Sequence, residues 1–188
     1  TDSAKGVVYE KPAAEELPTM PDDLDLNPAQ TFTTLEMDPD DPYLYTCETT
    51  VHVGDTPVDA VTDRFGCRTF RCDPDKGLYI NDKHVKIRGV CGHYDCGLLG
   101  KAVPDNVFRY KVRLMREMGA NGYRTSHYPQ AEALMDAFDE AGFIVMDETR
   151  WFSSAPAHMA ELAMLVKRDR NHPCVFFWSV GNEEFVFT

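Results

Sequence analysis

The feature that most constrains the fold is an alternation of strand-like and helix-like segments over residues 85–180. Four short apolar runs are expected to form strands, at Val85–Val90, Tyr123–Thr125, Phe143–Met146 and Cys174–Val180. Short connections join these runs to the helical segments between them, which favours parallel strands. The sequence therefore predicts a parallel sheet with helices packed against it.

Three helices are expected between these strands. The first is predicted to begin with Asn106 as its N-cap and to end at Gly119, the second to end at Gly142, and the third to span Met159–Arg168. Apolar residues recur on one face of each helix, at helical spacing: Phe108, Val112, Met115, Leu134, Met135, Phe138, Met159, Leu162, Ala163 and Val166.

The residues before this alternation indicate antiparallel β structure. Residues 1–42 are rich in Pro, Asp and Glu and have no apolar period, so they predict no element. Apolar and polar residues alternate over residues 44–53, Gly54 supplies a turn, and Val58–Phe65 can return as the partner strand. A second, shorter hairpin is expected from Leu78–Ile80 and Val85–Ile87, joined through Asn81, Asp82 and Lys83.

Polar and aromatic side chains follow each of the four expected strands. The carboxyl ends of parallel strands share one edge of a sheet, and ligand sites form there. The groups at this edge are His93, Tyr94 and Asp95; Arg124, Ser126, His127 and Tyr128; Asp147, Glu148 and Trp151; and Asn182, Glu183 and Glu184. The segment from Arg168 to Pro173 precedes the fourth strand instead, so its His172 is interpreted as structural.

Charge and cysteine content narrow the possible partners and compartments. A net charge of −12 repels phosphates, which excludes nucleic acid and anionic membrane surfaces as partners. No apolar run is long enough for a membrane span, and residues 1–10 do not resemble a signal peptide. Six cysteines without a CxxC pair are interpreted as reduced thiols of a cytoplasmic protein, with a Cys91–Cys96 disulfide as the alternative.

Four runs resemble the signature segments of the family 2 glycoside hydrolases, which include β-galactosidases and β-glucuronidases. They are RGVCGHYD from Arg88, GANGYRTSHYP from Gly119, GFIVMDE from Gly142 and KRDRNHPCVFFWSVGNE from Lys167. FGCRTF, from Phe65, resembles the exit of the family's immunoglobulin-like domain. The resemblance implies a partial immunoglobulin-like β-sandwich over residues 1–72. Residues 73–188 would then be the N-terminal half of a TIM barrel, with about four βα units; a complete barrel needs about 250 residues.

The same resemblance implies roles for individual residues of a retaining glycosidase. Glu183 would be the catalytic acid/base, and Asn182 would bind the sugar 2-hydroxyl. Arg124 would lie beside the catalytic carboxylates. The sugar-binding residues would be His93, Asp95 and His127, with Trp151 as a stacking face, although structural histidines and a core tryptophan remain alternatives. The family's nucleophile, a Glu at the end of the seventh strand, is absent from these residues, so this chain alone is expected to be inactive.

Two positions depart from the metal-binding β-galactosidases of the family. Those enzymes have a Glu and a His shortly after the third strand, where this chain has Phe152 and Ser154. We therefore expect no active-site metal and no cofactor. The alternative from another enzyme class is a metal-dependent barrel hydrolase, because His93 and Asp95 form an HxD pair after the first expected strand.

The substrate implied by the resemblance is a terminal β-linked sugar. GVCGHYDCGLLG, from Gly89, favours β-galactosidases, whereas GANGYRTSHYP also resembles β-glucuronidases, which are the alternative. A non-catalytic carbohydrate-binding fragment is the third possibility. Because half a barrel has open strand edges, we expect it to form a homo-oligomer or to associate with the missing half of the barrel.

Overall fold

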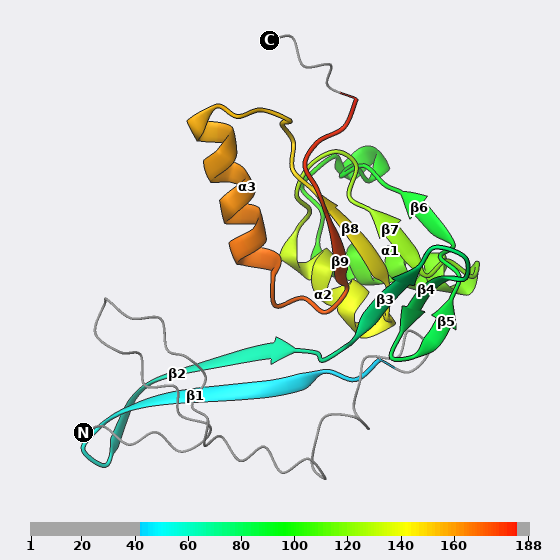
Figure 1. The fold of residues 1–188 in the computed structure, drawn as a ribbon. Coiled ribbons are helices and arrows are strands. Elements are labelled where there is room, and N and C mark those ends of the chain that lie inside the picture. The colour runs from blue at the N-terminus through cyan, green and yellow to red at the C-terminus, as the bar shows by residue number, and fades with distance from the viewer. Residues whose placement is uncertain (1–41, 184–188) are drawn as a thin grey trace.

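The computed structural model describes residues 42–183, which form three sheets and three α-helices (Figure 1). In chain order the elements are β1 (Tyr45–Val53), β2 (Thr56–Phe65), β3 (Phe70–Asp73), β4 (Gly77–Ile80), β5 (Lys83–Val85), β6 (Gly89–Cys91), a 3₁₀ helix (Gly97–Leu99), α1 (Asp105–Glu117), β7 (Gly122–Arg124), α2 (Glu132–Ala141), β8 (Ile144–Glu148), α3 (Pro156–Asp169) and β9 (Val175–Ser179).

The central sheet has the order β6-β7-β8-β9, and every neighbouring pair is parallel. Helices α1, α2 and α3 connect successive strands, so the described residues contain three βα steps and a fourth strand. The main apolar core is formed by residues of α1 and α2 packed against β7, β8 and the start of β9. The prediction of parallel strands separated by helices is confirmed.

The helices use the apolar positions that their spacing indicated, apart from α3. Phe108, Val112 and Met115 of α1 are buried, and α2 ends before Gly142, whose left-handed φ of 67° suits glycine. The predicted N-cap of α1 is wrong. The helix begins at Asp105, with Pro104 at the cap position and its carbonyl accepting the Val107 N–H, so Asn106 lies inside the first turn.

Helix α3 buries a different face from the one formed by the predicted apolar stripe. Leu165 and Asp169 are its buried residues, whereas Met159 is exposed. The predicted stripe of Met159, Leu162, Ala163 and Val166 lines an open groove of about 450 Å³. Leu165 is also apolar, so the sequence offers α3 two possible faces and does not choose between them.

A small antiparallel sheet, β3-β4-β5, closes the amino-terminal end of the parallel sheet. Leu78 and Ile80 of β4 pack against Ile144 and Phe176, near the starts of β8 and β9. Its hairpin turns at Asn81 and Asp82, both with positive φ, as a two-residue turn requires. The hairpin was predicted, but its second strand is Lys83–Val85 and not Val85–Ile87, so Lys83 belongs to the strand and only Asn81 and Asp82 form the turn.

The start of the first parallel strand is a correction to the predicted range of Val85–Val90. Val85 pairs with Leu78 in β5, antiparallel, and β6 begins only at Gly89. The domain boundary predicted between residues 72 and 73 falls inside β3, whose sheet packs on the α/β part. The division into two domains stays a prediction.

The long hairpin of β1 and β2 extends away from the α/β part (Figure 1). Its antiparallel pairing was predicted, and most of its side chains are exposed. Arg64 joins the hairpin to α2 through ion pairs with Asp136 (3.0 Å) and Glu140 (2.9 Å). A sandwich needs a second sheet over this one, so the immunoglobulin-like domain also stays a prediction.

The cysteines are free thiols, and Cys91 and Cys96 form no disulfide. Within residues 42–183, each helix is too short or too polar to cross a bilayer.

Candidate active site

Three polar side chains lie together at one edge of the sheet, at the carboxyl ends of β7, β8 and β9. Arg124 is the last residue of β7, Glu148 the last of β8 and Ser179 the last of β9. The parallel register pairs Glu148 with Ser179 and Arg124 with Met146, so these strand ends lie side by side. Sequence positions separated by up to 55 residues therefore meet in a single site.

Glu148 is the centre of this site and is completely buried. Its Oε2 accepts hydrogen bonds from Arg124 Nε (2.9 Å), Arg124 Nη2 (2.7 Å) and Ser179 Oγ (2.7 Å). Its Oε1 lies 2.8 Å from His127 Nδ1. Both carboxylate oxygens are thus occupied by protein groups, which makes Glu148 a poor candidate for a nucleophile or a proton donor.

The hydrogen bonds keep Glu148 ionised despite its burial. Burial alone would raise the pKa of its carboxyl, but the bonds from Ser179, Arg124 and His127 outweigh this effect and the pKa lies below its usual value. The bond to Glu148 in turn raises the pKa of Arg124, so the guanidinium is a fixed positive charge.

His127 is oriented by this carboxylate. Because Glu148 is ionised and can only accept, His127 Nδ1 must carry the proton and donate it. Nε2 is then the ring nitrogen through which His127 can serve a ligand. The His93 ring meets the His127 ring edge to face, with centroids 5.0 Å apart, so the two predicted sugar-binding histidines are adjacent.

Asn182 is fixed by the same arginine. Arg124 Nη2 donates to Asn182 Oδ1 at 2.7 Å, and a guanidinium can only donate, so the atom it meets must be the amide oxygen. The Nδ2 group is then the donor end of the Asn182 amide. Glu183 follows directly and is exposed. Arg124 thus lies beside a carboxylate, but that carboxylate is Glu148, so the predicted place of Arg124 beside the catalytic carboxylates stays a prediction.

The remaining predicted residues lie at the rim. His93 and Asp95 are exposed on the loop after β6, next to Tyr94, whose backbone N–H donates to Tyr128 Oη at 3.1 Å. Trp151 is 45% exposed, so it is not a core tryptophan. Its ring stacks on His158 and lies under the Arg150 guanidinium. A cavity of about 400 Å³ is lined by Trp151, Phe152, Ser153, Ser154, His158, Met159, Leu162 and Val180.

Sequence reasoning placed Glu148 at a strand end but did not select it as a site residue, and it did not consider Ser179 or Thr125. Thr125 Oγ1 accepts the Glu148 N–H at 2.8 Å and so ties the end of β8 to β7. The available signal was the acidic pair Asp147-Glu148 closing an apolar run, because an acid at the end of a buried strand needs partners on its neighbours.

His172 lies at the opposite end of the sheet, as predicted. Its Nδ1 is 2.6 Å from Asp139 Oδ2, and Asp139 Oδ1 accepts the Cys174 N–H at 2.9 Å. Asp136, Asp139 and His172 are the one group of three potential metal ligands found in residues 42–183, and it does not include His93 or Asp95. The described geometry therefore gives the HxD pair no third ligand.

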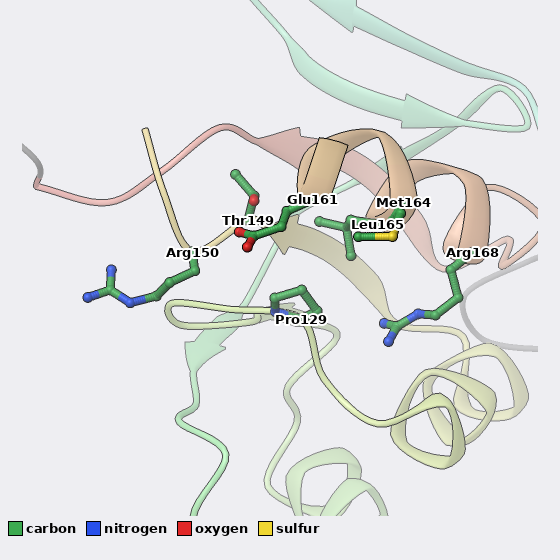
Figure 2. A pocket seen from close by; sticks show the side chains of 7 residues that line it. All are labelled: Pro129, Thr149, Arg150, Glu161, Met164, Leu165 and Arg168. Atoms are coloured by element: carbon green, nitrogen blue, oxygen red, sulfur yellow. The ribbon is translucent and has the colours of Figure 1, made fainter. Parts of the chain in front are cut away.

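A separate cavity of about 290 Å³ lies between α3 and the loops after β7 and β8. Figure 2 shows its lining residues, Pro129, Thr149, Arg150, Glu161, Met164, Leu165 and Arg168, with Arg150 extending away from the rest. None of the predicted site residues lines it.

The sequence and the fold both match known proteins. The sequence model described as "Glycosyl hydrolases family 2, TIM barrel domain" matches residues 74–159 and 153–187. A β-galactosidase of Bacteroides ovatus, BoGH2A, is 43% identical over 158 residues, covering 78% of this chain and 19% of that protein. A β-glucuronidase of Bacteroides fragilis is 33% identical over 158 residues, covering 77% of this chain and 23% of that protein.

Solved structures give the same result. A β-glycosidase from Bacteroides vulgatus superposes with a TM-score of 0.73 at 34% identity, covering 79% of this chain and 21% of that one. A β-glucuronidase from Parabacteroides merdae superposes with a TM-score of 0.72 at 32% identity, with coverage of 79% and 19%. The chain thus spans about a fifth of the length of these relatives.

Proposed function

Because the chain belongs to family 2 of the glycosyl hydrolases, we propose that it is part of a retaining glycosidase that hydrolyses terminal β-linked sugars. The observation that carries the proposal is the contact of Arg124 with both Glu148 and Asn182, beside Glu183, at the carboxyl edge of the parallel strands. This is the edge at which barrel enzymes bind substrates.

Glu183 is proposed as the acid/base. In the first step its carboxyl group donates a proton to the glycosidic oxygen as the bond to the sugar breaks. In the second step the resulting carboxylate removes a proton from the attacking water. Its exposure supports this role, because a leaving group and a water must both reach it. Glu148, buried and fully hydrogen-bonded, is proposed to position Arg124 and His127 instead.

Asn182 and the histidines are proposed to bind the sugar. Asn182 would donate from Nδ2 to the 2-hydroxyl oxygen, a contact that strengthens in the transition state. His127, fixed by Glu148, and its neighbour His93 would bind other hydroxyls together with Asp95. Trp151, with 45% of its surface exposed, would stack against a sugar ring.

We propose that the second catalytic carboxylate comes from residues outside these 188, about 5–5.5 Å from Glu183, as retention of configuration requires. The four parallel strands would then be the first half of a TIM barrel, and the β1-β2 hairpin one edge of an immunoglobulin-like sandwich. The apolar groove on α3 would be covered by the rest of the barrel or by a second copy. The free thiols support a cytoplasmic location.

A β-galactoside is the proposed substrate, supported by the 43% identity to a protein named β-galactosidase. A β-glucuronide is the second candidate, because several relatives at 30–35% identity carry the name β-glucuronidase. The two sugars differ in the configuration of the 4-hydroxyl, and only the glucuronide has a carboxylate at C6, so a glucuronidase needs a cation near C6.

The test uses the longest gene product that carries these 188 residues, called the parent protein below. Nitrophenyl β-galactoside and nitrophenyl β-glucuronide are compared by kcat/KM. Glu183→Gln is expected to lower kcat about 10²–10⁴-fold on substrates with poor leaving groups, and less on those with good ones. Glu161→Gln, an exposed acid on α3, is the matched control and should be neutral.

Two results would contradict the proposal. Equal activity of Glu183→Gln and Glu161→Gln on every leaving group would remove Glu183 from the chemistry. Sugar binding without hydrolysis by the parent protein would favour the carbohydrate-binding alternative.

A further inference from the structure

Asp147 and Asp169 form a buried acid pair behind the active-site edge. Asp147 precedes Glu148 in β8, Asp169 is the last residue of α3, and both are completely buried. The two carboxyl groups lie close enough to act on one another. Within the described residues, Asp147 Oδ2 is buried without any N–H or O–H donor directed at it.

The contacts decide which acid carries the proton. Two carboxylates can share a hydrogen bond only if one of them is protonated, since an ionised carboxylate has no hydrogen to donate. Arg168 donates from Nε to Asp169 Oδ1 and from Nη2 to Asp169 Oδ2, both at 2.6 Å, which makes Asp169 the anion. The proton therefore belongs on Asp147, at the Oδ2 that receives no donor.

The surroundings of Asp147 support this assignment. Burial, and then the hydrogen bond and charge of Asp169, raise the pKa of Asp147 to about 7, although Thr125 and Arg168 act in the opposite direction. The Cys174 thiol, before β9, also interacts with Asp147. Burial raises the pKa of this thiol well above its usual value, so the thiol is neutral.

Thr125 connects this pair to the active site. Its hydroxyl accepts the Glu148 N–H at 2.8 Å, and its own hydrogen can reach Asp147 Oδ1 at 3.2 Å. The other acceptor, the Met146 carbonyl, is farther at 3.5 Å. A chain of contacts thus runs from Asp169 through Asp147 and Thr125 to the backbone of the residue that holds Arg124 and His127.

We propose that Asp147 is a neutral carboxylic acid that donates a hydrogen bond to Asp169, and that it is a positioning residue for Glu148 through Thr125. Ionisation of Asp147 would place two negative charges together without water and push β8 and α3 apart at this point. The site would then lose its geometry although no group that touches the substrate has changed. The effect on turnover rests on the proposed function, whereas the protonation of Asp147 does not.

The protonation is tested by infrared spectroscopy of the parent protein with isotope-labelled aspartate. At about pH 6, between the usual pKa of Asp and the raised one, the wild type should show the C=O band of a protonated carboxyl that Asp147→Asn lacks. Asp136→Asn, which removes the carboxylate paired with Arg64, is the control and should keep the band. Absence of the band from the wild type would overturn the proposal.

The positioning role is tested with variants that differ in what they can donate. In Asp147→Asn the side-chain amide can still donate to Asp169 and accept from Thr125, so kcat should stay within about threefold of the wild type at pH 6. In Asp147→Ala both hydrogen bonds are lost, so kcat should fall about tenfold or more. Above about pH 7 the wild type should lose kcat faster than Asp147→Asn, because only the wild type ionises there. Equal losses in Asp147→Asn and Asp147→Ala would overturn the role.

A second variant keeps the test decisive if Asp147→Ala does not fold. Thr125→Val keeps the shape of the side chain but removes the hydroxyl that links Asp147 to Glu148. The variant should therefore keep the infrared band but change the position of the His127 ring signals in NMR spectra. An unchanged His127 signal would overturn the link to Glu148. Because the band and this signal need no substrate, both can be read even if the parent protein hydrolyses no glycoside, a result that would remove the proposed function alone.

Discussion

Arg124 directs two nitrogens, Nε at 2.9 Å and Nη2 at 2.7 Å, to the same oxygen of Glu148, Oε2. This leaves Oε1 for His127, and Nη2 also reaches Asn182. One buried carboxylate thereby sets the directions of two groups proposed to touch the sugar. The site is organised before any ligand binds, which lowers the cost of ordering it during the reaction.

Glu148→Gln should disorganise this site. The glutamine NH₂ group would face donors from Arg124, His127 or Ser179, so at least one of them loses its acceptor. We expect kcat/KM to fall about 10²-fold and the unfolding free energy to fall by about 2–3 kcal/mol, less than for a fully buried pair because Arg124 is 30% exposed. Enzyme kinetics and urea denaturation of the parent protein measure the two effects.

The pH dependence of the same variant has a defined sign. Because the pKa of Glu148 is lowered by folding, its stabilising contribution is complete above the usual value of 4.5 and is lost as the pH falls through the folded value. The unfolding free energy of Glu148→Gln should therefore fall less than that of the wild type as the pH is lowered through this range. Glu140→Gln, which breaks half-exposed ion pairs with Arg64 and Arg109, is the comparison. The pKa of Glu140 is also lowered, so this variant should change the acid-side stability in the same direction, but it should cost less than about 1 kcal/mol.

Gly122→Ala should weaken the contact between β6 and β7. A Cβ at position 122 would lie 2.7 Å from Ile87 Cγ2 and 3.3 Å from Gly89 Cα, and the latter is backbone that cannot rotate away. We expect a loss of about 1–3 kcal/mol by urea denaturation. Gly89, which pairs with Gly122 in the sheet, provides the control, because a Cβ at position 89 would meet nothing closer than 3.6 Å. If Gly89→Ala were as unstable as Gly122→Ala, the steric explanation would be contradicted.

His172→Gln should change stability on the alkaline side. Burial lowers the pKa of His172, but the hydrogen bond and charge of Asp139 outweigh burial and raise it above 6.5. The stabilisation is therefore complete below 6.5 and is lost as the pH rises through the folded value. Between about pH 6 and pH 9 the wild type should lose about 1–2 kcal/mol more than His172→Gln. His84→Gln, at an exposed histidine, is the control and should leave the dependence of the unfolding free energy on pH as it is in the wild type.

Chelation separates the glycosidase from a metal-dependent hydrolase. Phe152 and Ser154 offer no charged metal ligand, and His93 and Asp95 have no third ligand nearby in the described residues. Dialysis of the parent protein against EDTA should leave kcat/KM within about twofold. Stoichiometric zinc that is lost in His93→Ala would favour the metal-dependent class.

Much of the α/β part could be predicted from the sequence because its signals are local. The spacing of Phe108, Val112 and Met115, and the stop at Gly142, depend only on neighbours along one helix. The meeting of polar side chains from β7, β8 and β9 was also expected, because the carboxyl ends of parallel strands share one edge. The place of Arg124 beside the catalytic carboxylates stays a prediction.

The parts that could not be predicted depend on contacts between elements. Asp147 and Glu148 are consecutive, so their side chains leave opposite faces of β8, and a strand that is apolar on both faces gives no sign of which acid faces the site. The face of α3 that packs inward was missed for the same reason. Val85 could extend either of two neighbouring strands, and its pairing with Leu78 decides which.

The buried Glu148 cluster also suggests how relatives with different names can share this segment. Its members stand at the ends of β7, β8 and β9, where any change disturbs several hydrogen bonds at once, whereas His93, Asp95 and Trp151 lie on loops that the cluster does not constrain. If the proposed function holds, mutations in the loops would alter which sugar is accepted, while the surroundings of the proposed acid/base stay the same. Divergence toward galactosides or glucuronides would then proceed by replacement of the loops around this buried cluster.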